Sequence, residues 1–374
     1  MPRLPTTDDF HSPVHDTRVV ARLGLWLGIA FGICFLTGLV SHVQQHPLGG
    51  LAVPPVPAWG YRVTQGVHVF TGIASVPLLL AKVYAAYPRL FERPVLGSPL
   101  RLLERGSIGV LVASAFLQVV TGVFNGAQWY VFGFGFTAVH WALAWVAVGA
   151  LLVHIAVKLP IIRDALTRPI TAGPGPERDR RWFLRGALGV AAGAVALTVG
   201  QAIPALEPVA VLGKRHPRHS PLGVPVNRTA VAAGVDESVE EGAWRVHLVG
   251  PGGSRDLGWG ELRAMPQAQV ELPIACVEGW SVTARWSGVR MRDLVGLAGG
   301  GEGAFVRVES AEGHGVYRRT SLPAAHAAHP DTLLALTLNG HRLTPDHGFP
   351  ARIIAPDRPG VLQTKWVRRL EVVG

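Results

Sequence analysis

The chain has few cysteines, only two among its 374 residues. Cys34 lies in the middle of a long apolar run, whereas Cys276 ends a short apolar run in the second half of the chain. These settings do not favour a disulfide, because the two Cα atoms of a disulfide lie within about 7 Å. A lone thiol such as Cys276 is an inert buried side chain, a nucleophile or a soft metal ligand.

Acidic residues are also scarce, 25 against 35 lysines and arginines, which gives a formal charge of +10. An excess of positive charge can indicate nucleic acid binding. Here the basic residues cluster beside long apolar runs, so we interpret them as topology signals of a membrane protein. We therefore expect the membrane as a partner and no nucleic acid.

Five apolar runs reach the roughly 20 residues needed to cross a bilayer. They are predicted at about 18–41, 65–87, 107–129, 136–157 and 186–206. The chain beyond them has short β-type segments broken by glycine and proline, and is long enough for its own core. We predict a multi-domain protein: an all-α transmembrane bundle of four helices (1–160), a segment with a fifth anchoring span and a linker (161–226), and an α+β domain (227–374).

The basic residues also predict the orientation. Lysine and arginine prefer the cytoplasmic side of a membrane. The segments after the second and fourth runs are rich in arginine, whereas the loops 43–64 and 126–135 contain only Arg62 between them. We therefore expect a multi-pass protein of the bacterial cytoplasmic membrane with its N-terminus inside and its C-terminal domain outside.

A paired arginine precedes the fifth run, in the segment Arg180-Arg181-Trp182-Phe183-Leu184-Arg185-Gly186. With the weakly hydrophobic, alanine-rich run that follows, it resembles a twin-arginine translocation signal placed inside the chain. The alternative is an ordinary basic flank of a span. A route for folded proteins would suit a domain that takes up its cofactor in the cytoplasm.

Ionisable residues inside spans are costly and usually functional. His140 and His154 are 14 residues apart in the fourth run, close to a whole number of helical turns, so they face the same way about 21 Å apart. His68 and Lys82 have the same spacing in the second run. Because both runs cross in the same direction, we expect His68 at the depth of His140 and Lys82 at the depth of His154.

Facing histidines on neighbouring helices can hold a haem between them. We predict that His68 and His140 bind the iron of a haem b; the alternative is that each imidazole satisfies a polar neighbour. A second haem is left open, with His154 and His42 as candidate ligands. Lys82 could instead contact a haem propionate or take part in proton movement near a quinone.

The bundle resembles the membrane cytochrome b subunits of bacterial oxidoreductases, in which two histidines 14 residues apart on the fourth helix serve two haems. It departs from them at Leu25-Trp26, where that family has a His-Trp pair. That family passes electrons between quinone and a redox domain, so the resemblance implies the quinone or quinol pool as a partner.

Two motif groups in the C-terminal half resemble the sulfite-oxidase-type molybdopterin-binding domain. The first comprises Cys276-Val277-Glu278-Gly279-Trp280-Ser281, Trp286-Ser287-Gly288-Val289 and Asp293-Leu294-Val295. The second is His347-Gly348-Phe349-Pro350-Ala351-Arg352-Ile353-Ile354-Ala355-Pro356, then Lys365-Trp366-Val367 and Leu370-Glu371-Val372. They occur in the family's order and cover roughly residues 227 to 373.

The resemblance implies molybdenum held by the dithiolene of a pterin and by the thiolate of Cys276, a soft ligand. It places His347, Arg352 and Lys365 at cofactor-binding positions, with Asn227, Arg228 and Thr229 as weaker candidates. The alternative for Arg352 and Lys365 is that they are surface charges on strands. The segment 326–329 has no cysteine or carboxylate at metal spacing, and we expect it to be solvated.

Cys276 is followed by Val-Glu-Gly-Trp, whereas vertebrate-type sulfite oxidases have Ala-Gly-Asn-Arg at this place. The anion-binding arginine is therefore missing, which disfavours sulfite as the substrate. The domain resembles the bacterial periplasmic branch, some members of which reduce sulfoxides. The expected substrate is a small molecule or a sulfoxide-like compound, and the sequence does not identify it.

We therefore predict a membrane-bound molybdopterin-dependent oxidoreductase that carries out two-electron chemistry, oxygen-atom transfer, while haem b exchanges electrons with the quinone pool. One alternative is a transmembrane haem electron conduit whose outer domain docks a partner. Another is a membrane-anchored binding or assembly protein with an empty fold. The sequence indicates no catalytic acid or base, direction of electron flow or oligomeric state.

Overall fold

The computed structural model describes residues 5–47, 53–93, 98–171, 173–203, 205–235 and 242–374. Parts of the expected loop 43–64 and of the expected C-terminal domain, residues 48–52 and 236–241, lie outside these. The chain forms two compact units. The helical unit comprises Met1–Gly38, Val67–Gly200 and Ala205–Leu212; the sheet unit comprises Leu39–Gly66, Gln201–Pro204 and Gly213–Gly374.

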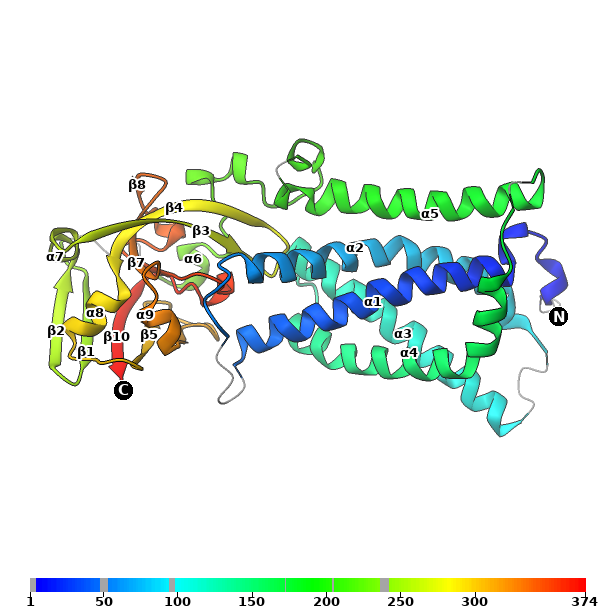
Figure 1. Cartoon of the computed structure of the whole chain (residues 1–374), viewed down its shortest axis with the longest axis horizontal. Helices are drawn as coiled ribbons and strands as arrows, with labels where there is room; N and C mark the ends of the chain where they lie inside the picture. The colour runs from blue at the N-terminus through cyan, green and yellow to red at the C-terminus, as the bar shows by residue number, and fades with distance from the viewer. Residues whose placement is uncertain (1–4, 48–52, 94–97, 172, 204, 236–241) are drawn as a thin grey trace. The chain divides into compact units, whose positions relative to one another are not determined.

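The first half of the chain is made of five long helices (Figure 1). They are α1 (Thr17–Gln45), α2 (Gly60–Ala86), α3 (Pro99–Ala127), α4 (Phe136–Thr167) and α5 (Pro176–Val199). All five are long and apolar enough to cross a membrane, which confirms the predicted spans. All but α4 begin before the predicted apolar runs, and α1 and α4 also continue past them, because charged residues at helix ends are compatible with helix. Helices α2, α3 and α5 end before the predicted runs do, α5 at Val199 where 206 was expected.

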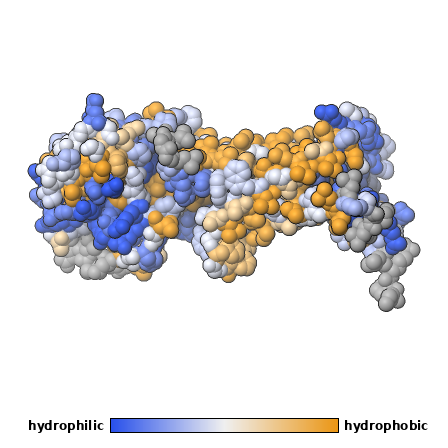
Figure 2. Space-filling view, turned by 90° about the horizontal axis from the view of Figure 1, so that it is seen from below, coloured by the Kyte–Doolittle hydropathy of each residue, from blue (hydrophilic) through white to orange (hydrophobic). Residues whose placement is uncertain are grey.

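The surface of these helices is apolar. At most 28% of the most hydrophobic stretch of each helix is buried inside the protein. Figure 2 shows that hydrophobic residues cover the helices, whereas the surface of the C-terminal domain is largely polar. Such a surface would aggregate in water but suits contact with lipid, where helices satisfy their own backbone groups. The helices are therefore those of a membrane bundle.

Four of the five helices share one apolar core in the helical unit. Its buried members are Val19, Val20, Leu23 and Leu27 of α1, Leu78, Leu79 and Ala85 of α2, Ala115 of α3, and Leu184, Ala187 and Ala191 of α5. Alanines at these positions let helices approach closely. Helix α4 packs against α3.

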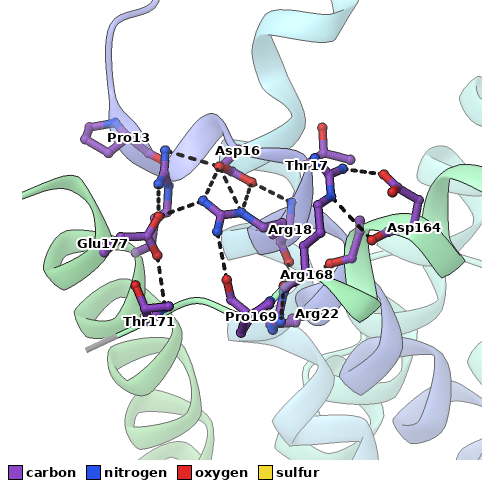
Figure 3. A network of polar contacts seen from close by, with 12 residues as sticks. Pro13, Asp16, Thr17, Arg18, Arg22, Asp164, Arg168, Pro169, Thr171 and Glu177 are labelled. Atoms are coloured by element: carbon purple, nitrogen blue, oxygen red, sulfur yellow. Dashed lines mark hydrogen bonds and ion pairs between the residues drawn. The ribbon is translucent and has the colours of Figure 1, made fainter. Parts of the chain in front are cut away.

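An ionic cluster joins the start of α1 to the start of α5 (Figure 3). Arg18 donates to Asp16 at 3.0 Å and to Glu177 at 2.7 Å. Arg180, the first arginine of the twin-arginine-like segment, contacts the same two carboxylates and donates to the backbone oxygen of Pro13 at 2.9 Å. The guanidinium of Arg180 is therefore bound within the helical unit.

The sheet unit contains one mixed and one antiparallel β-sheet, which together with its helices confirms the α+β prediction. One has the strand order β2-β1-β10-β5-β6; in the other the order is β3-β4-β7-β8, with β9 also pairing with β7. The strands are β1 (Arg245–Gly250), β2 (Gly253–Gly258), β3 (Gln267–Ala275), β4 (Ser281–Arg290), β5 (Phe305–Ser310), β6 (Arg319–Leu322), β7 (Leu333–Leu338), β8 (His341–Arg342), β9 (Arg352–Ile354) and β10 (Val367–Val373). Short helices α6 (Ala230–Ala233), α7 (Trp259–Ala264), α8 (Met291–Leu297) and α9 (Ala324–Ala328) connect them.

One expectation for this domain is wrong. The first half of the segment 326–329 is not solvated: His326 in α9 is only 3% exposed and Ala327 belongs to the main apolar core, whereas Ala328 is exposed and His329 is half-buried. Burial lowers the pKa of His326 to about 4, so the imidazole is neutral. The packing of α9 against the sheet is a tertiary contact that a short polar-looking segment does not predict.

Candidate functional site

Cys276 lies in the tight turn between β3 and β4. Its backbone N–H donates to the Trp280 oxygen at 3.0 Å, and the Gly279 N–H donates to the Cys276 oxygen at 3.1 Å. Gly279 has φ 93°, a conformation that favours glycine. The Cys276 side chain is 2% exposed and faces a cavity. Burial raises the pKa of its thiol, and so does the charge of Glu278, so a thiolate there requires a neighbouring metal cation.

The same cavity brings together most of the predicted cofactor residues. Its walls include Asn227, Arg228, Cys276, Trp280, Glu312, Tyr317, Asp346, His347, Arg352, Gln363 and Lys365. Thr229 is not among the lining residues; its hydroxyl accepts from the Ala232 N–H and caps α6. Residues from distant parts of the sequence therefore converge on the Cys276 turn.

Arg352 is buried at this cavity, only 4% exposed, which excludes the alternative of a surface charge. Its Nη atoms donate to the backbone oxygens of His347 and Gln363 at 3.1 and 3.2 Å, and it lies over the Trp286 ring. Its Nε has no hydrogen-bond partner among the described residues. Burial lowers the pKa of Arg352 to about 9.

Lys365 is the second cation of the cavity wall. Its Nζ donates to the backbone oxygens of Arg228 at 2.6 Å and Asp346 at 2.9 Å. Burial, and then the charge of Arg352, lower the pKa of Lys365 to about 7. Among the described residues, neither Arg352 nor Lys365 forms an ion pair with a carboxylate, although the charges of Glu312 and Asp346 act on Lys365 from further away. Buried cations that lack a directly paired counter-charge are costly. The cavity therefore fits an anionic group such as a phosphate.

The remaining predicted residues are held by protein contacts. The two ring nitrogens of His347 lie 2.7 Å from the Thr344 hydroxyl and 2.8 Å from the Val224 oxygen, and burial lowers the pKa of His347. Arg228 donates to Glu312 at 2.7 Å and to the His314 oxygen at 2.9 Å. These residues shape the wall of the cavity, whereas Arg352 and Lys365 supply positive charges that form no ion pair with a carboxylate.

Two proton-bearing side chains of the cavity were missed from the sequence. Glu312 and Tyr317 lie between β5 and β6, in a segment that carries no recognisable motif. Burial raises the pKa of both groups, more than the Arg228 charge lowers that of Glu312. Both are therefore candidate proton donors, and only the folded sheet brings them to Cys276.

The beginning of α2 also contacts the Cys276 turn within the sheet unit. Gln65 Nε2 donates to the Val277 oxygen at 3.4 Å, and Arg62 Nη1 donates to the Thr283 hydroxyl at 2.9 Å. Asp357 accepts from the Tyr61 N–H and from Gln44 Nε2. A Cβ at Gly60 would come within 2.7 Å of the Asp357 carboxylate, so only glycine leaves room for this contact.

His68 and His140 face each other in the helical unit, as predicted. Their ring centres are 6.1 Å apart, with the planes at 75°. Metal–imidazole bonds of about 2 Å on both sides of one ion would separate two ring centres by roughly 6 Å. The Nδ1 atoms lie 2.9 Å from the Cys34 oxygen and 2.9 Å from the Thr121 hydroxyl, respectively. Both Nε2 atoms are therefore directed away from these contacts, as in axial ligands.

Glycines line this histidine pair. A Cβ at Gly38 would lie 3.2 Å from His68, and a Cβ at Gly122 would lie 3.3 Å from His140. Both distances are tight for carbon atoms, so a larger residue would displace the imidazoles. The close packing of these glycines therefore fixes the positions of the two imidazoles.

The other candidate ligands are arranged differently. His42 stacks on His46, with ring centres 4.7 Å apart. Lys82 donates to the Val20 oxygen at 3.4 Å and lies against Gly24, and it interacts electrostatically with His154. Within the described residues, no group of three or more His, Cys, Asp or Glu side chains could hold a metal ion.

Comparison with known proteins assigns the sheet-bearing half. Residues 232–374 match the family described as oxidoreductase molybdopterin binding domain. Sulfite oxidase of Gallus gallus is 33% identical over 164 residues, which are 36% of this chain and 36% of that protein. The putative protein-methionine-sulfoxide reductase subunit YedZ1 of Azospira oryzae is 34% identical over 113 residues, 30% of this chain and 42% of that protein.

The uncharacterized oxidoreductase YuiH of Bacillus subtilis is 35% identical over 117 residues, 31% of this chain and 57% of that protein. The chain thus spans less than two thirds of the length of each of these relatives. The match begins after the membrane helices and includes Cys276, Arg352 and Lys365. Residues 232–374 are therefore a molybdopterin-binding domain of the molybdenum-dependent oxidoreductases.

Proposed function

We propose that this chain is a membrane-bound molybdenum oxidoreductase that acts by two-electron oxygen-atom transfer. The observation that carries the proposal is the cavity in which a buried thiol, Cys276, faces two cations without carboxylate partners, Arg352 and Lys365. Cys276 would supply the protein ligand to molybdenum. Arg352 and Lys365 would hold the pterin phosphate, with His347, Asn227, Arg228 and Thr229 shaping the pocket around it.

When bound, the molybdenum cofactor supplies the exchange of an oxygen atom and two electrons. The protein supplies binding and protons. Reduction of a sulfoxide to a sulfide consumes two electrons and two protons and releases water, so the cavity must deliver protons to the departing oxygen. Tyr317 and Glu312 line the wall, and burial raises the pKa of each, which favours their protonated forms and makes them the candidate proton donors.

The substrate class follows from the charges beside the thiol. The Cys276 motif lacks the arginine after the cysteine that sulfite would call for, and Glu278 stands in the turn instead. A neutral sulfoxide does not need that arginine. The similarity to a protein named as a methionine-sulfoxide reductase subunit supports the same class.

The helical unit would carry the electrons. His68 and His140 would bind one haem b through their Nε2 atoms, and the haem would exchange electrons with the quinone or quinol pool. Their separation and their Nδ1 contacts support this role. His154 and His42 stay candidates for a second haem, with Lys82 near His154.

The membrane arrangement completes the proposal. We place the N-terminus in the bacterial cytoplasm and the molybdopterin domain outside, on the distribution of arginines between the loops. The segment 180–186 would serve twin-arginine export of the folded domain. Because Arg180 is bound by Asp16 and Glu177 in the folded bundle, recognition of this segment would precede that contact.

A haem reoxidation assay tests the function. The purified full chain is reduced with a quinol analogue, methionine sulfoxide is added, and the haem spectrum is followed in wild type and Cys276→Ala. Reoxidation only in the wild type supports the proposal. Equal reoxidation in both would remove molybdenum from the reaction and favour a haem conduit, and no reoxidation of a molybdenum-loaded wild type would rule out this sulfoxide.

A further inference from the structure

The turn that carries Cys276 contains a nearly buried carboxylate. The Glu278 side chain is 8% exposed and accepts from Trp280 Nε1 at 3.1 Å. The turn is closed by the backbone bond from Cys276 to Trp280, so Glu278 is held two residues from the thiol. A buried carboxylate needs a counter-charge, because desolvation of an unpaired ion is costly.

That counter-charge comes from outside the motif. Arg215 Nε lies 3.6 Å from Glu278 Oε2. Arg215 belongs to the segment between α5 and the first strand, where the sequence showed only proline and basic residues. The positive charge of Arg215 lowers the pKa of the Cys276 thiol, whereas the negative charge of Glu278 raises it.

The segment that carries Arg215 is fixed to the domain at two further points. The Leu222 oxygen accepts from Asn339 Nδ2 at 2.8 Å, and the Val224 oxygen lies 2.8 Å from His347 Nε2. Arg218, three residues after Arg215, has an exposed side chain. Arg215, by contrast, is half-buried beside Glu278.

We propose that Arg215 is a positioning residue that balances the charge of Glu278 beside Cys276 and so favours the reduced state of the metal held there. The inference rests on the proposed function, because it requires molybdenum at Cys276. A net negative charge near a metal stabilises its oxidised state, and neighbouring residues tune metal potentials in this way. Arg215 thus supplies, from the linker, a positive charge that the Cys276 motif itself lacks.

The test is a redox titration of the purified, cofactor-loaded full chain, followed by the molybdenum EPR signal. We expect Arg215→Gln to lower the molybdenum midpoint potential, Glu278→Gln to raise it, and the double variant to lie close to wild type. Arg215→Lys should keep the wild-type potential. Arg218→Gln is the matched control, because it removes the same charge from the same segment.

The outcomes separate the two proposals. Wild type without molybdenum would contradict the proposed function itself. A loaded Arg215→Gln protein with the potential of Arg218→Gln would overturn the inference. If Arg215→Gln does not fold or load, Glu278→Gln decides, because a potential equal to wild type in that variant would also overturn it.

Discussion

The histidine pair of the helical unit and the cavity of the sheet unit satisfy buried polar groups in different ways. The imidazoles of His68 and His140 are neutral ligand-type groups, each held at Nδ1 by an oxygen atom. The cavity instead buries the cations Arg352 and Lys365, which donate to backbone oxygens and lack a carboxylate partner. The imidazole pair is suited to a ligand that brings no net charge to be neutralised by the protein, whereas the two cations are suited to an anion.

The two sites also differ because the helical unit faces lipid, whereas the sheet unit faces water. Charges are expensive in a bilayer, so the span sites rely on neutral rings, hydroxyls and backbone oxygens. The sheet domain has a polar surface and can tolerate a cavity whose charges are balanced only by a ligand. Four predictions test or refine this contrast, in order of decreasing effect.

Loss of one histidine of the pair should have the largest effect. His140→Ala leaves an iron with one axial imidazole, so we expect nearly complete loss of the b-type haem spectrum. His341→Ala is the control and should retain the spectrum, because His341 is exposed on β8 of the sheet unit and is not a candidate haem ligand. A reduced-minus-oxidised spectrum of each purified variant measures this, and a normal spectrum in His140→Ala would exclude the pair as the haem site.

Removing a cavity cation should weaken the retention of the cofactor. We expect Lys365→Met to lower molybdenum content about tenfold or more at limiting cofactor, equivalent to about 1.4 kcal/mol or more of binding free energy. Arg255→Met, on the exposed edge strand β2, is the control and should load normally. Metal analysis of both proteins decides, and equal loading would mean that Lys365 does not hold the phosphate.

The same lysine predicts a pH dependence of stability. The pKa of Lys365 falls from 10.5 to about 7 on folding, so between these values the unfolded chain binds more protons than the folded chain. The free energy of unfolding of the cofactor-free protein should therefore rise as pH increases from about 7 to 10.

In loaded protein the phosphate would offset the cost of burying the Lys365 charge and flatten this rise. Thermal unfolding of both forms across this range measures it, with Lys365→Met as the control, and equal slopes in the loaded and free forms would contradict the account.

The contact between α2 and the sheet domain should give the smallest effect. Asp357→Asn removes the charge that accepts from the Tyr61 N–H, which costs about 1–3 kcal/mol for a bond to a charged group. The exposed Glu302→Gln serves as the control. We expect a lower unfolding temperature for Asp357→Asn alone, with the haem spectrum unchanged. An unchanged temperature would show that this contact adds nothing to stability.

The sequence predicts the helical site well because its information is local. His68 and His140 each follow from spacing along one helix, and apolar length alone gives the five spans. The helix ends were less predictable: α3 begins at Pro99 and α4 continues to Thr167, because hydropathy marks only the lipid-facing part. His42 illustrates the limit, since its partner His46, just past the end of the same helix, was not anticipated.

The cavity could be predicted only where a family motif covers it. Cys276, Arg352 and Lys365 were found in this way, but Glu312, Tyr317 and Arg215 were not, because only the arrangement of the sheets and of the linker brings them to the thiol. Thr229 shows the converse: it lies next to lining residues in sequence, yet its side chain caps α6. Adjacency in sequence does not establish a role in the site.

The measurement that most directly tests the account is metal analysis with a reduced-minus-oxidised visible spectrum on the detergent-purified chain, with wild type, Cys276→Ala and His140→Ala side by side. We predict about one molybdenum per chain and a b-type spectrum in wild type, loss of molybdenum alone in Cys276→Ala, and loss of haem alone in His140→Ala. Molybdenum retained in full in Cys276→Ala, or neither metal in wild type, would contradict the central claim that one chain joins these two separate sites.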